Sequence, residues 1–364
     1  MPKKITDFTS ALLQWFAKAM CPLPWRRDYD PYSVWISEIM LQQTQMERGV
    51  KYFNAWLRTL PTIQSVAEAS EETILSLWEG LGYYSRARNL QAAAKIIVDK
   101  YDSNFPAAYE AIRALPGIGE YTAGAIASIA FNQAVPAIDA NVMRIFTRIL
   151  DIDTPLAAKA TKSRVKQRVG ELLATTAPRL FNQALMELGA LVCTKNPSCA
   201  QCPVNSSCLA FRRGIVAERP LPQQPKRYTY SELAAGIVFY NKRIYIQKRP
   251  PEGLWASLWE FPHISIASNM QPEQALARYL ATIFNAKVKV REKIAVVKHG
   301  YTTNRVTLHG FMLDAAEKAQ PAIPDNGVWI YPREAENYAF AAGYRKLLEK
   351  LGLKPSSTQS TMKT

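Results

Sequence analysis

Four of the five cysteines lie within a stretch of 16 residues, and this cluster limits the possible folds more than any other feature of the sequence. They are Cys193, Cys199, Cys202 and Cys208, separated by five, two and five residues. Disulfides are uncommon in cytoplasmic proteins, and four thiols this close together indicate one shared metal centre. The sequence therefore predicts a loop that must fold around one metal site.

The spacing of these cysteines distinguishes between two kinds of metal site. Zinc sites usually use two Cys-x2-Cys pairs joined by a longer loop, whereas this loop has one such pair flanked by single cysteines. The pattern favours a [4Fe–4S] cluster, with zinc and four unrelated buried cysteines as the alternatives. Cys21 lies far from the loop, and we expect it to be a small residue of the hydrophobic core.

The chain is long enough for two domains and is strongly basic. It has 364 residues and a net charge of +15, of which +6 falls on residues 1–225 and +9 on residues 226–364. A basic surface attracts phosphate backbones or anionic lipids. The sequence has no run of apolar residues long enough to predict a membrane-spanning helix. We therefore expect a cytoplasmic protein whose partner is nucleic acid.

Helical periodicity dominates residues 1–211, which are predicted to be mainly α. Pro and Gly residues punctuate the pattern. The expected helices are 6–19, 31–57, 62–80, 86–100, 106–114, 120–131, 140–150 and 162–175. A linker rich in Pro and Arg is expected at 212–228, and a disordered, Ser/Thr-rich tail at 353–364.

Residues 229–352 have the pattern of an α+β domain, with β-branched and aromatic runs that predict strands. The expected strands are 236–240, 243–247, 287–291, 294–298 and 306–311, and the expected helices are 272–284 and 333–350. A segment of this length is sufficient for one independent domain.

A Leu-Pro-Gly-Ile-Gly segment at 115–119 separates two predicted helices. Gly117 and Gly119 permit a tight turn and a close approach to the backbone. The helix that follows offers free N–H groups that can bind a DNA phosphate. Twenty residues after Gly119, Asp139 precedes another predicted helix. An aspartate there is usually an N-cap, and the capping hydrogen bonds and helix dipole favour its ionised form.

The hairpin, the aspartate twenty residues later and the four-cysteine loop together resemble the helix–hairpin–helix DNA glycosylases, which include endonuclease III. Four further segments narrow the resemblance to the MutY-type adenine DNA glycosylases, which remove adenine mispaired with 8-oxoguanine and, more weakly, with guanine. These segments are Pro24–Arg26, Trp35–Gln45, Gly80–Leu90 and Phe181–Ala190. The resemblance implies that residues 1–211 form a mainly α helix–hairpin–helix glycosylase domain with an iron–sulfur loop.

The residue at position 121 distinguishes between two kinds of glycosylase. In endonuclease III-like enzymes, a lysine two residues after the second hairpin glycine attacks the sugar and forms a Schiff base. Tyr121 occupies this place, and a phenol cannot form an imine. The chain is therefore expected to be monofunctional, hydrolysing the glycosidic bond without an efficient β-lyase step.

The resemblance implies roles for four catalytic residues. Glu38 is the general acid that protonates adenine N7, and apolar neighbours in its predicted helix favour a raised pKa. Asp139 stabilises the oxocarbenium-like sugar, while Asn141 and Tyr121 support the site by hydrogen bonding. The adenine nucleotide has to leave the base stack before it reacts.

The same resemblance implies the residues that contact DNA. Arg26 and Gln183 are expected at the adenine pocket. Leu41, Gln43 and Tyr83 are expected to probe and wedge the base stack at the opposite 8-oxoguanine. Ordinary core packing is the alternative for Leu41 and Tyr83.

Residues 248–262 resemble the MutT-like (nudix) domain of the same family, through the sequence Gly-Leu-Trp-Ala-Ser-Leu-Trp-Glu-Phe-Pro. A nudix-like domain at 229–352 is thus expected to recognise 8-oxoguanine. The predicted helix 272–284 lacks the clustered carboxylates of hydrolytic nudix enzymes. This difference argues against a magnesium-dependent pyrophosphatase.

The chain departs from the family pattern at two places. The family often has Phe-Ser-His where this chain has Tyr301, Thr302 and Thr303. Tyr301 can still wedge and Thr302 can still donate a hydrogen bond, but the histidine is missing, which bears on selectivity for 8-oxoguanine over guanine. The first cysteine interval is five residues, where the family usually has six, and this bears on the geometry of the cluster.

Three other functions fit parts of the sequence. Tyr121 argues against an endonuclease III-like glycosylase/lyase. The presence of both Glu38 and Asp139 argues against a non-catalytic DNA-binding iron–sulfur protein, and the missing carboxylates argue against a nudix hydrolase. The main hypothesis is a monomeric, bacterial-type adenine DNA glycosylase in the cytoplasm, acting at the nucleoid. Its partner is double-stranded DNA with an A·8-oxoguanine or A·G mispair, and no membrane is expected.

Overall fold

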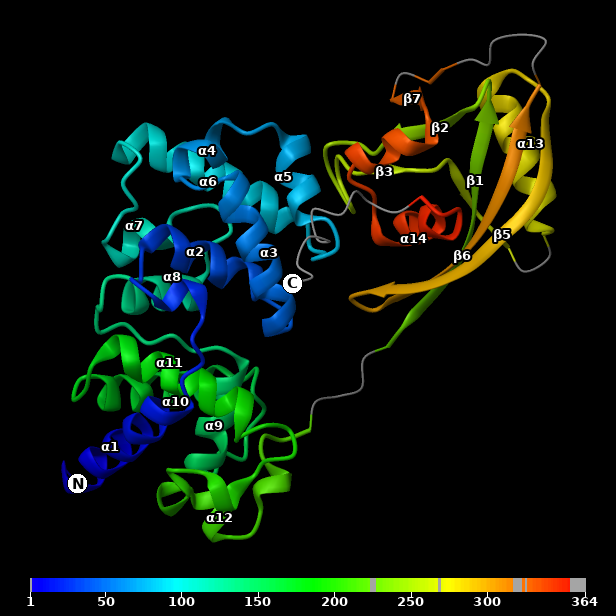
Figure 1. Cartoon of the computed structure of the whole chain (residues 1–364). Helices are drawn as coiled ribbons and strands as arrows, with labels where there is room; N and C mark the ends of the chain where they lie inside the picture. Colours follow the sequence, from blue (N-terminus) through cyan, green and yellow to red (C-terminus); the bar gives the residue numbers. More distant parts are fainter. Residues whose placement is uncertain (1, 223–226, 268–269, 317–322, 325, 354–364) are drawn as a thin grey trace, which may run out of the picture. The chain divides into compact units, whose positions relative to one another are not determined.

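The computed structural model describes residues 2–222, 227–267, 270–316, 323–324 and 326–353. The chain forms two compact units (Figure 1). Unit 1 comprises Met1–Glu68 and Asn89–Gln224, and unit 2 comprises Ala69–Arg88 and Pro225–Thr364. Unit 2 thus contains a short segment from the first quarter of the chain in addition to the C-terminal residues.

Unit 1 consists of helices joined by loops, which confirms the predicted mainly α fold. Its α-helices are α1 (Pro2–Ala19), α2 (Pro31–Met40), α3 (Met46–Thr59), α4 (Ile63–Glu68), α6 (Ser85–Tyr101, which begins in unit 2), α7 (Tyr109–Arg113), α8 (Glu120–Ile129), α9 (Ala140–Ile149), α10 (Lys159–Leu173), α11 (Pro178–Leu191) and α12 (Leu209–Arg212). Short 3₁₀ turns lie at Pro24–Arg26, Cys199–Gln201, Asn205–Ser207 and Val216–Glu218.

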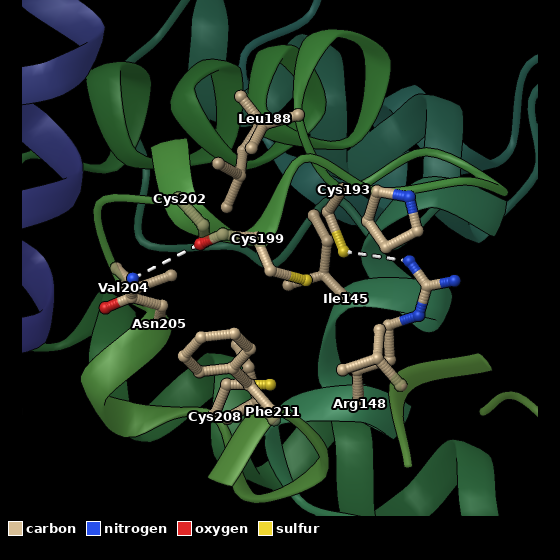
Figure 2. A pocket seen from close by; sticks show the side chains of 14 residues that line it. Ile145, Arg148, Leu188, Cys193, Cys199, Cys202, Val204, Asn205, Cys208 and Phe211 are labelled. Atoms are coloured by element: carbon tan, nitrogen blue, oxygen red, sulfur yellow. Dashed lines mark hydrogen bonds between the residues drawn. The ribbon is translucent and has the colours of Figure 1, made fainter. Parts of the chain in front are cut away.

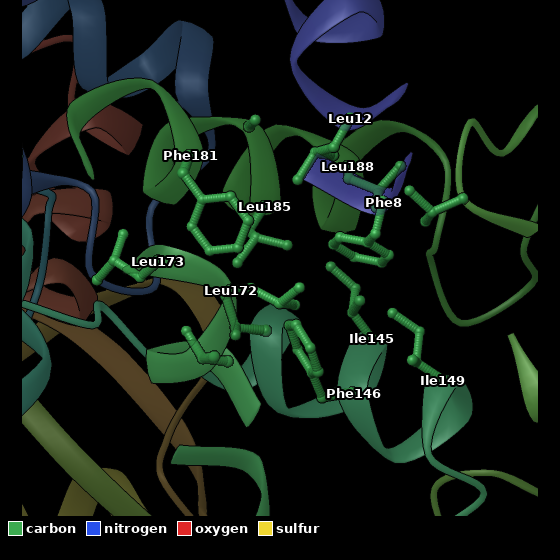
Figure 3. Packing of buried hydrophobic residues seen from close by; sticks show 14 of the residues in the cluster. Phe8, Leu12, Ile145, Phe146, Ile149, Leu172, Leu173, Phe181, Leu185 and Leu188 are labelled. Carbon is green, nitrogen blue, oxygen red and sulfur yellow. The ribbon is translucent and has the colours of Figure 1, made fainter. Parts of the chain in front are cut away.

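Helices α1, α9, α10 and α11 pack around one hydrophobic cluster (Figure 3). Phe8 and Leu12 are four residues apart and therefore lie on the same face of α1. The Phe8 ring contacts the ring of Phe146 in α9, with centroids 6.3 Å apart, and Leu185 in α11 is fully buried. Burial of this apolar surface stabilises the fold and fixes the position of α9, whose first turn follows Asp139.

The single helix expected over 31–57 is wrong, because α2 ends at Met40 and α3 begins at Met46. The Leu41 N–H closes the last turn of α2 on the carbonyl of Ser37. Gln43 then adopts a φ of 57°, a left-handed conformation that interrupts a right-handed helix. Gly49 in α3 leaves room for Leu41, since a Cβ there would lie 2.6 Å from Leu41 Cδ2. The packing of Leu41 therefore favours the break.

The single helix expected over 62–80 is also wrong, because α4 ends at Glu68 and α5 spans Glu71–Trp78. The Ser70 hydroxyl accepts a hydrogen bond from the Thr73 N–H at 3.1 Å, and a capping serine of this kind starts a new helix. The periodicity also missed α11, which begins with a proline in its first turn. Cys21 is exposed rather than part of the core.

The described residues of unit 2 form a seven-stranded sheet with the order β3-β2-β1-β6-β5, in which β4 also pairs with β1 and β7 with β2. The strands are β1 (Thr229–Tyr240), β2 (Arg243–Lys248), β3 (Trp259–Glu260), β4 (His263–Ser265), β5 (Val288–Tyr301), β6 (Asn304–Ala315) and β7 (Gly327–Ile330). Strands β1 and β6 are parallel, and β5 and β6 form a long antiparallel hairpin.

Two helices cover opposite faces of this sheet. Leu280 of α13 (Pro272–Phe284) approaches Gly236 in β1, and Leu347 of α14 (Ala342–Lys350) approaches Gly310 in β6. Gly236 is paired with Phe311, the residue after Gly310, and successive residues of a strand face opposite sides. A sheet between two helices confirms the predicted α+β fold of the C-terminal part.

Two predictions in unit 2 need correction. The strands expected at 287–291 and 294–298 are one strand, β5, whose register with β6 shifts between Val290 and Glu292 and between Lys293 and Ala295. These irregularities interrupt the alternating pattern in the sequence. The helix expected at 333–350 is divided into a 3₁₀ turn at Pro332–Asn337 and α14.

The first part of the segment predicted as a linker is attached to unit 1. The Arg148 Nε donates a hydrogen bond to the Arg219 carbonyl at 2.9 Å, and the Arg219 Nε lies 2.8 Å from Asp151 Oδ1. Residues 354–364 of the predicted tail lie outside the described residues. Among the helices that the structure describes, none combines the length and hydrophobicity needed to cross a membrane.

Candidate active site

One pocket of unit 1 brings together residues that are far apart in the sequence. It has an empty volume of about 1540 Å³ and is lined by the 3₁₀ turn at Pro24–Arg26, by α2 and the turn after it, and by parts of α8, α9 and α11. The sequence-predicted residues that line it are Arg26, Glu38, Leu41, Gln43, Tyr121, Asp139, Asn141 and Gln183. The other predicted DNA-contacting residues do not line this pocket; they are Gly117, Gly119, Tyr83, Tyr301 and Thr302.

Glu38 is a buried carboxyl at the wall of the pocket. It is 9% exposed and lies in α2, most of whose residues are buried. Burial raises the pKa of Glu38 to about 7, and the negative charge of Asp139 adds to the rise, while Tyr121 and Arg26 act in the opposite direction. Glu38 can therefore hold a proton near neutral pH, which a general acid requires.

Tyr121 is the hydrogen-bond partner of Glu38. Its hydroxyl donates to Glu38 Oε2 at 3.0 Å and lies 3.9 Å from the sulfur of Met186. Burial and the nearby carboxylates of Glu38 and Asp139 hold the pKa of Tyr121 well above its ordinary value. The phenol therefore stays protonated and acts as a donor that orients the Glu38 carboxyl.

Asp139 is the N-cap of α9, as the sequence predicts. Its Oδ1 accepts from the Val142 N–H at 2.7 Å, and its Oδ2 accepts from Asn141 Nδ2 at 2.7 Å. Arg144 continues this network, donating to Asn141 Oδ1 at 2.8 Å and to the Cys193 carbonyl at 2.7 Å. The carboxylate is thus held in one orientation at the positive end of a helix.

Three residues that were not predicted as site residues hold Asp139 and Asn141 in place. Gly124 in α8 lets the segment before Asp139 approach closely, because a Cβ there would lie 2.3 Å from the Pro136 carbonyl oxygen. Gly189 in α11 likewise leaves room for Asn141, because a Cβ on Gly189 would lie 2.5 Å from the Cβ of Asn141. The buried Asn182 donates to the Val135 carbonyl at 2.9 Å. No local sequence motif marks these contacts, because each joins segments that are distant in the chain.

Arg26 and Gln183 line the pocket on another side, and Arg26 is neutralised by a residue that the sequence reasoning missed. Arg26 Nη2 lies 2.8 Å from Glu187 Oε2, and both side chains are 9% exposed. Gln183 donates to the Arg179 carbonyl at 3.1 Å. Glu187 lies four residues after Gln183, and this helical spacing is the signal that could have found it.

The hairpin predicted to bind phosphate lies between α7 and α8. Gly117 adopts a φ of 76°, and a Cβ there would lie 2.7 Å from the Asn89 side chain, so the turn requires glycine. Gly119 is the N-cap residue of α8, and a Cβ there would contact nothing within 4 Å. The start of α8 is therefore open, and its free N–H groups are accessible to an anion.

The other predicted DNA-contacting residues lie in unit 2. Tyr83 is 44% exposed, which excludes ordinary core packing for its side chain, and its backbone φ is 48°. Tyr301 ends β5, and Thr302 lies in the turn that leads to β6. The Tyr301 ring packs edge-to-face against Trp255, with centroids 4.9 Å apart. Trp255 was not predicted from the sequence to lie beside the DNA-contacting residue Tyr301.

The four clustered cysteines surround a second cavity of unit 1, with an empty volume of about 390 Å³ (Figure 2). Its other walls are mainly apolar, with Ile145, Leu188 and Val204 among them. Two 3₁₀ turns shape the loop: the Cys202 N–H donates to the Cys199 carbonyl at 3.2 Å, and Asn205 Nδ2 donates to the same carbonyl at 3.2 Å. Folding therefore directs all four thiols toward one space.

The donor set of this cavity fits a metal–sulfur group. Burial raises the pKa of Cys202 to about 11, so thiolates in this space need nearby positive charge. Arg148 supplies part of it, since its Nη1 lies 3.3 Å from Cys193 Sγ (Figure 2). Within the described residues, no three Cys, His, Asp or Glu side chains converge closely enough to bind a single metal ion.

Two family models match parts of the chain. A model of the HhH-GPD superfamily base excision DNA repair proteins matches residues 36–174, and a NUDIX domain model matches residues 234–350. The adenine DNA glycosylases of Mus musculus and Homo sapiens are each 31% identical to the chain, covering 94% of it and 77% and 74% of the relatives. A solved structure of a thermostable thymine-DNA glycosylase shares the fold, with a TM-score of 0.52 and 24% identity, over 58% of this chain and 98% of that one.

Proposed function

Because the chain belongs to the adenine DNA glycosylases, which are base-excision-repair enzymes, we propose that it hydrolyses the N-glycosidic bond of adenine mispaired with 8-oxoguanine or guanine. The observation that carries this proposal is that one pocket holds both the buried, hydrogen-bonded Glu38 and Asp139, the N-cap residue of α9. Two carboxyl groups with different surroundings can hold opposite protonation states, as glycoside hydrolysis requires.

Glu38 acts as the general acid in this proposal. The adenine nucleotide is flipped out of the duplex into the pocket, and Glu38 protonates N7 of the base. The base then leaves as a neutral molecule while the sugar becomes oxocarbenium-like. Tyr121 keeps the Glu38 carboxyl oriented, and after base departure the ionised Glu38 accepts a proton from the attacking water.

Asp139 stabilises the positive charge that develops on the sugar. Its two oxygens are held by Val142 and Asn141, so the carboxylate does not need to reorganise during the reaction. Preorganised charge of this kind contributes strongly to catalysis. Arg26, Glu187 and Gln183 form the side of the pocket that we assign to adenine binding.

Selection of the mispair depends on residues that contact the rest of the duplex. We assign Leu41, Gln43 and Tyr83 to probing the base stack, and Tyr301 and Thr302 to recognition of 8-oxoguanine. The start of α8 after Gly119 binds a DNA phosphate without reading sequence. Residues 1–211 are the proposed catalytic domain and residues 229–352 the proposed recognition domain, in a monomer that works in the cytoplasm.

Alkali-dependent strand scission tests the main proposal. We expect the protein to release adenine from a duplex with an A·8-oxoguanine pair, and we expect strand cleavage only after treatment with alkali. Tyr121 gives the physical reason, because a phenol cannot form the Schiff base that leads to β-elimination. An A·T duplex is the matched control and should remain intact. Strand cleavage without alkali, together with efficient borohydride trapping, would contradict the monofunctional mechanism.

The four cysteines are the proposed ligands of a [4Fe–4S] cluster. When bound, the cluster would hold the two ends and the middle of the loop at 193–208 together, since all four proposed ligands lie within that loop. Apolar side chains line the cavity, and the Arg148 side chain would partly balance the charge of the thiolates.

Metal analysis tests this assignment. We expect about four iron and four sulfide ions per chain in protein purified without oxygen, and a large loss of both in Cys202→Ala. Cys21→Ala is the matched control and should retain the iron, because Cys21 is exposed and does not line the cavity. One zinc ion per chain in place of iron would overturn the assignment.

A further inference from the structure

An ion pair in unit 2 joins two residues that are 266 positions apart in the sequence. Arg345 in α14 forms a two-pronged contact with Glu79, in which Nε donates to Oε1 at 2.5 Å and Nη2 donates to Oε2 at 2.9 Å. The side chains are only 8% and 17% exposed. A bidentate arginine–carboxylate pair with this degree of burial fixes both distance and angle.

The surroundings of Arg345 leave its guanidinium little freedom. Nη1 donates to the Ala335 carbonyl at 3.2 Å, Nη2 also donates to the Tyr338 carbonyl at 2.6 Å, and the ring of Phe340 lies 5.0 Å below the guanidinium carbon. Arg345 is therefore already positioned by the C-terminal part of the chain. Glu79 docks onto a preformed site rather than onto a mobile surface side chain.

Glu79 is the C-cap residue that follows α5 and begins the loop carrying Tyr83. Several contacts join the residues of this loop to one another. Trp78 Nε1 and Arg86 Nη2 both donate to the Gly82 carbonyl at 3.1 Å, and the Arg86 guanidinium lies over the rings of Trp78 and Tyr83 at 5.2 and 5.7 Å. A displacement of Glu79 would therefore move Tyr83 with it.

Two further contacts attach the same segment to the C-terminal part of unit 2. Trp259 Nε1 donates to Glu72 Oε1 at 2.9 Å, and Arg88 Nη1 donates to the Ala256 carbonyl at 2.8 Å. Glu72 and Arg88 flank the Tyr83 loop on its two sides in the sequence. Ala256 immediately follows Trp255, whose ring packs against Tyr301. The peptide bond between Trp255 and Ala256 thus joins the ring that packs against Tyr301 to the carbonyl that accepts from Arg88.

We propose that the Glu79–Arg345 pair positions the Tyr83 loop on the C-terminal part of unit 2, so that Arg345 is a positioning residue for mispair selectivity. The inference rests on the proposed function, because it assumes that Tyr83 probes the base stack and that Tyr301 meets 8-oxoguanine. Arg345 itself contacts neither base. Its contribution is to keep the position of Tyr83 fixed relative to Tyr301 when the duplex is bound.

The test measures single-turnover adenine release from A·8-oxoguanine and A·G duplexes, and takes the ratio of the two rates as selectivity. We expect Arg345→Ala to lower this ratio about tenfold, with the A·G rate little changed. Tyr83→Ala should lower the ratio by a similar factor, and the double variant should lose no more than either single one. Glu79→Gln, which keeps the shape of the side chain but removes its charge, should reproduce the Arg345→Ala result.

Arg291→Ala is the matched control, because it breaks an arginine–aspartate pair in the same unit that is 49% and 42% exposed. This variant should keep the full ratio. Full selectivity in Arg345→Ala and Glu79→Gln, or additive losses in the double variant, would overturn the positioning role alone. An unchanged ratio in Tyr83→Ala would overturn the role of Tyr83 and the positioning role with it. Failure of the unmodified protein to release adenine would instead overturn the proposed function.

Discussion

Replacement of Glu38 by glutamine should slow adenine release from an A·8-oxoguanine duplex at least about 100-fold, and up to about 10,000-fold. Glutamine has the same shape and can still accept the hydrogen bond from Tyr121, but it has no proton to transfer to the leaving base. The rate constant of base release under single-turnover conditions measures the effect directly. The binding affinity for the same duplex should change little, since the substitution removes an interaction that matters in the transition state.

Glu110→Gln provides the control for this substitution. Glu110 lies in α7 with its side chain 80% exposed and a weak contact to Arg113 at 3.9 Å, so its charge can be removed without affecting the pocket. Its rate should match that of the unmodified chain. Adenine release by Glu38→Gln within a factor of about three of the unmodified rate, which is well below the contribution of a general acid, would remove Glu38 from this role.

The same experiment against pH tests the direction of the pKa shift. Burial raises the pKa of Glu38 to about 7, and a general acid is active only while it is protonated. The rate should therefore be retained below about pH 7 and fall about tenfold for each pH unit above it. Residual release by Glu38→Gln should lack this decline. A decline that begins near the pH at which an ordinary exposed glutamate titrates would contradict the buried acid.

The sequence predicts much of the fold because local signals and the hydrophobic pattern agree. The left-handed backbone of Gly117, the N-cap at Asp139 and the apolar pattern of α1 each depend on residues within about one helical turn. The failures have a different origin. Helical propensity continues through Leu41 and Gln43, and the break after α2 depends on the fit of Leu41 against Gly49, a tertiary contact that overrides propensity.

In the candidate site, too, the sequence predicts individual residues but not the tertiary contacts between them. Patterns typical of the family lead to Glu38, Tyr121 and Asp139, although nothing local shows that Tyr121 and Glu38, 83 residues apart, form a hydrogen bond. The pairing of Arg26 with Glu187 and the contact of Gly189 with Asn141 were not predicted. Each of these contacts joins two segments that are distant in the chain. It cannot be predicted from one sequence until the fold shows that the two segments pack together.

Asp139→Asn is expected to slow adenine release about 100- to 1,000-fold, by removing preorganised charge from the site of the developing cation. Asparagine is as good an N-cap as aspartate, so the hydrogen bond from the Val142 N–H and the start of α9 should survive. The temperature of thermal unfolding should therefore change little while the rate constant falls. This separation of stability from rate identifies a catalytic charge, because a residue that merely caps the helix would change neither.

Asp30→Asn offers a control at another N-cap, where the aspartate also accepts from the N–H three residues later. Asp30 caps α2, accepting from the Ser33 N–H at 2.8 Å, but it does not line the pocket. Since the same substitution is made at the same helical position, the effects on the N-cap hydrogen bond should be similar in the two variants. We expect Asp30→Asn to release adenine at the unmodified rate. Equal rates for Asp139→Asn and Asp30→Asn would show that Asp139 is only a cap, and the oxocarbenium-like sugar would then need another source of stabilisation.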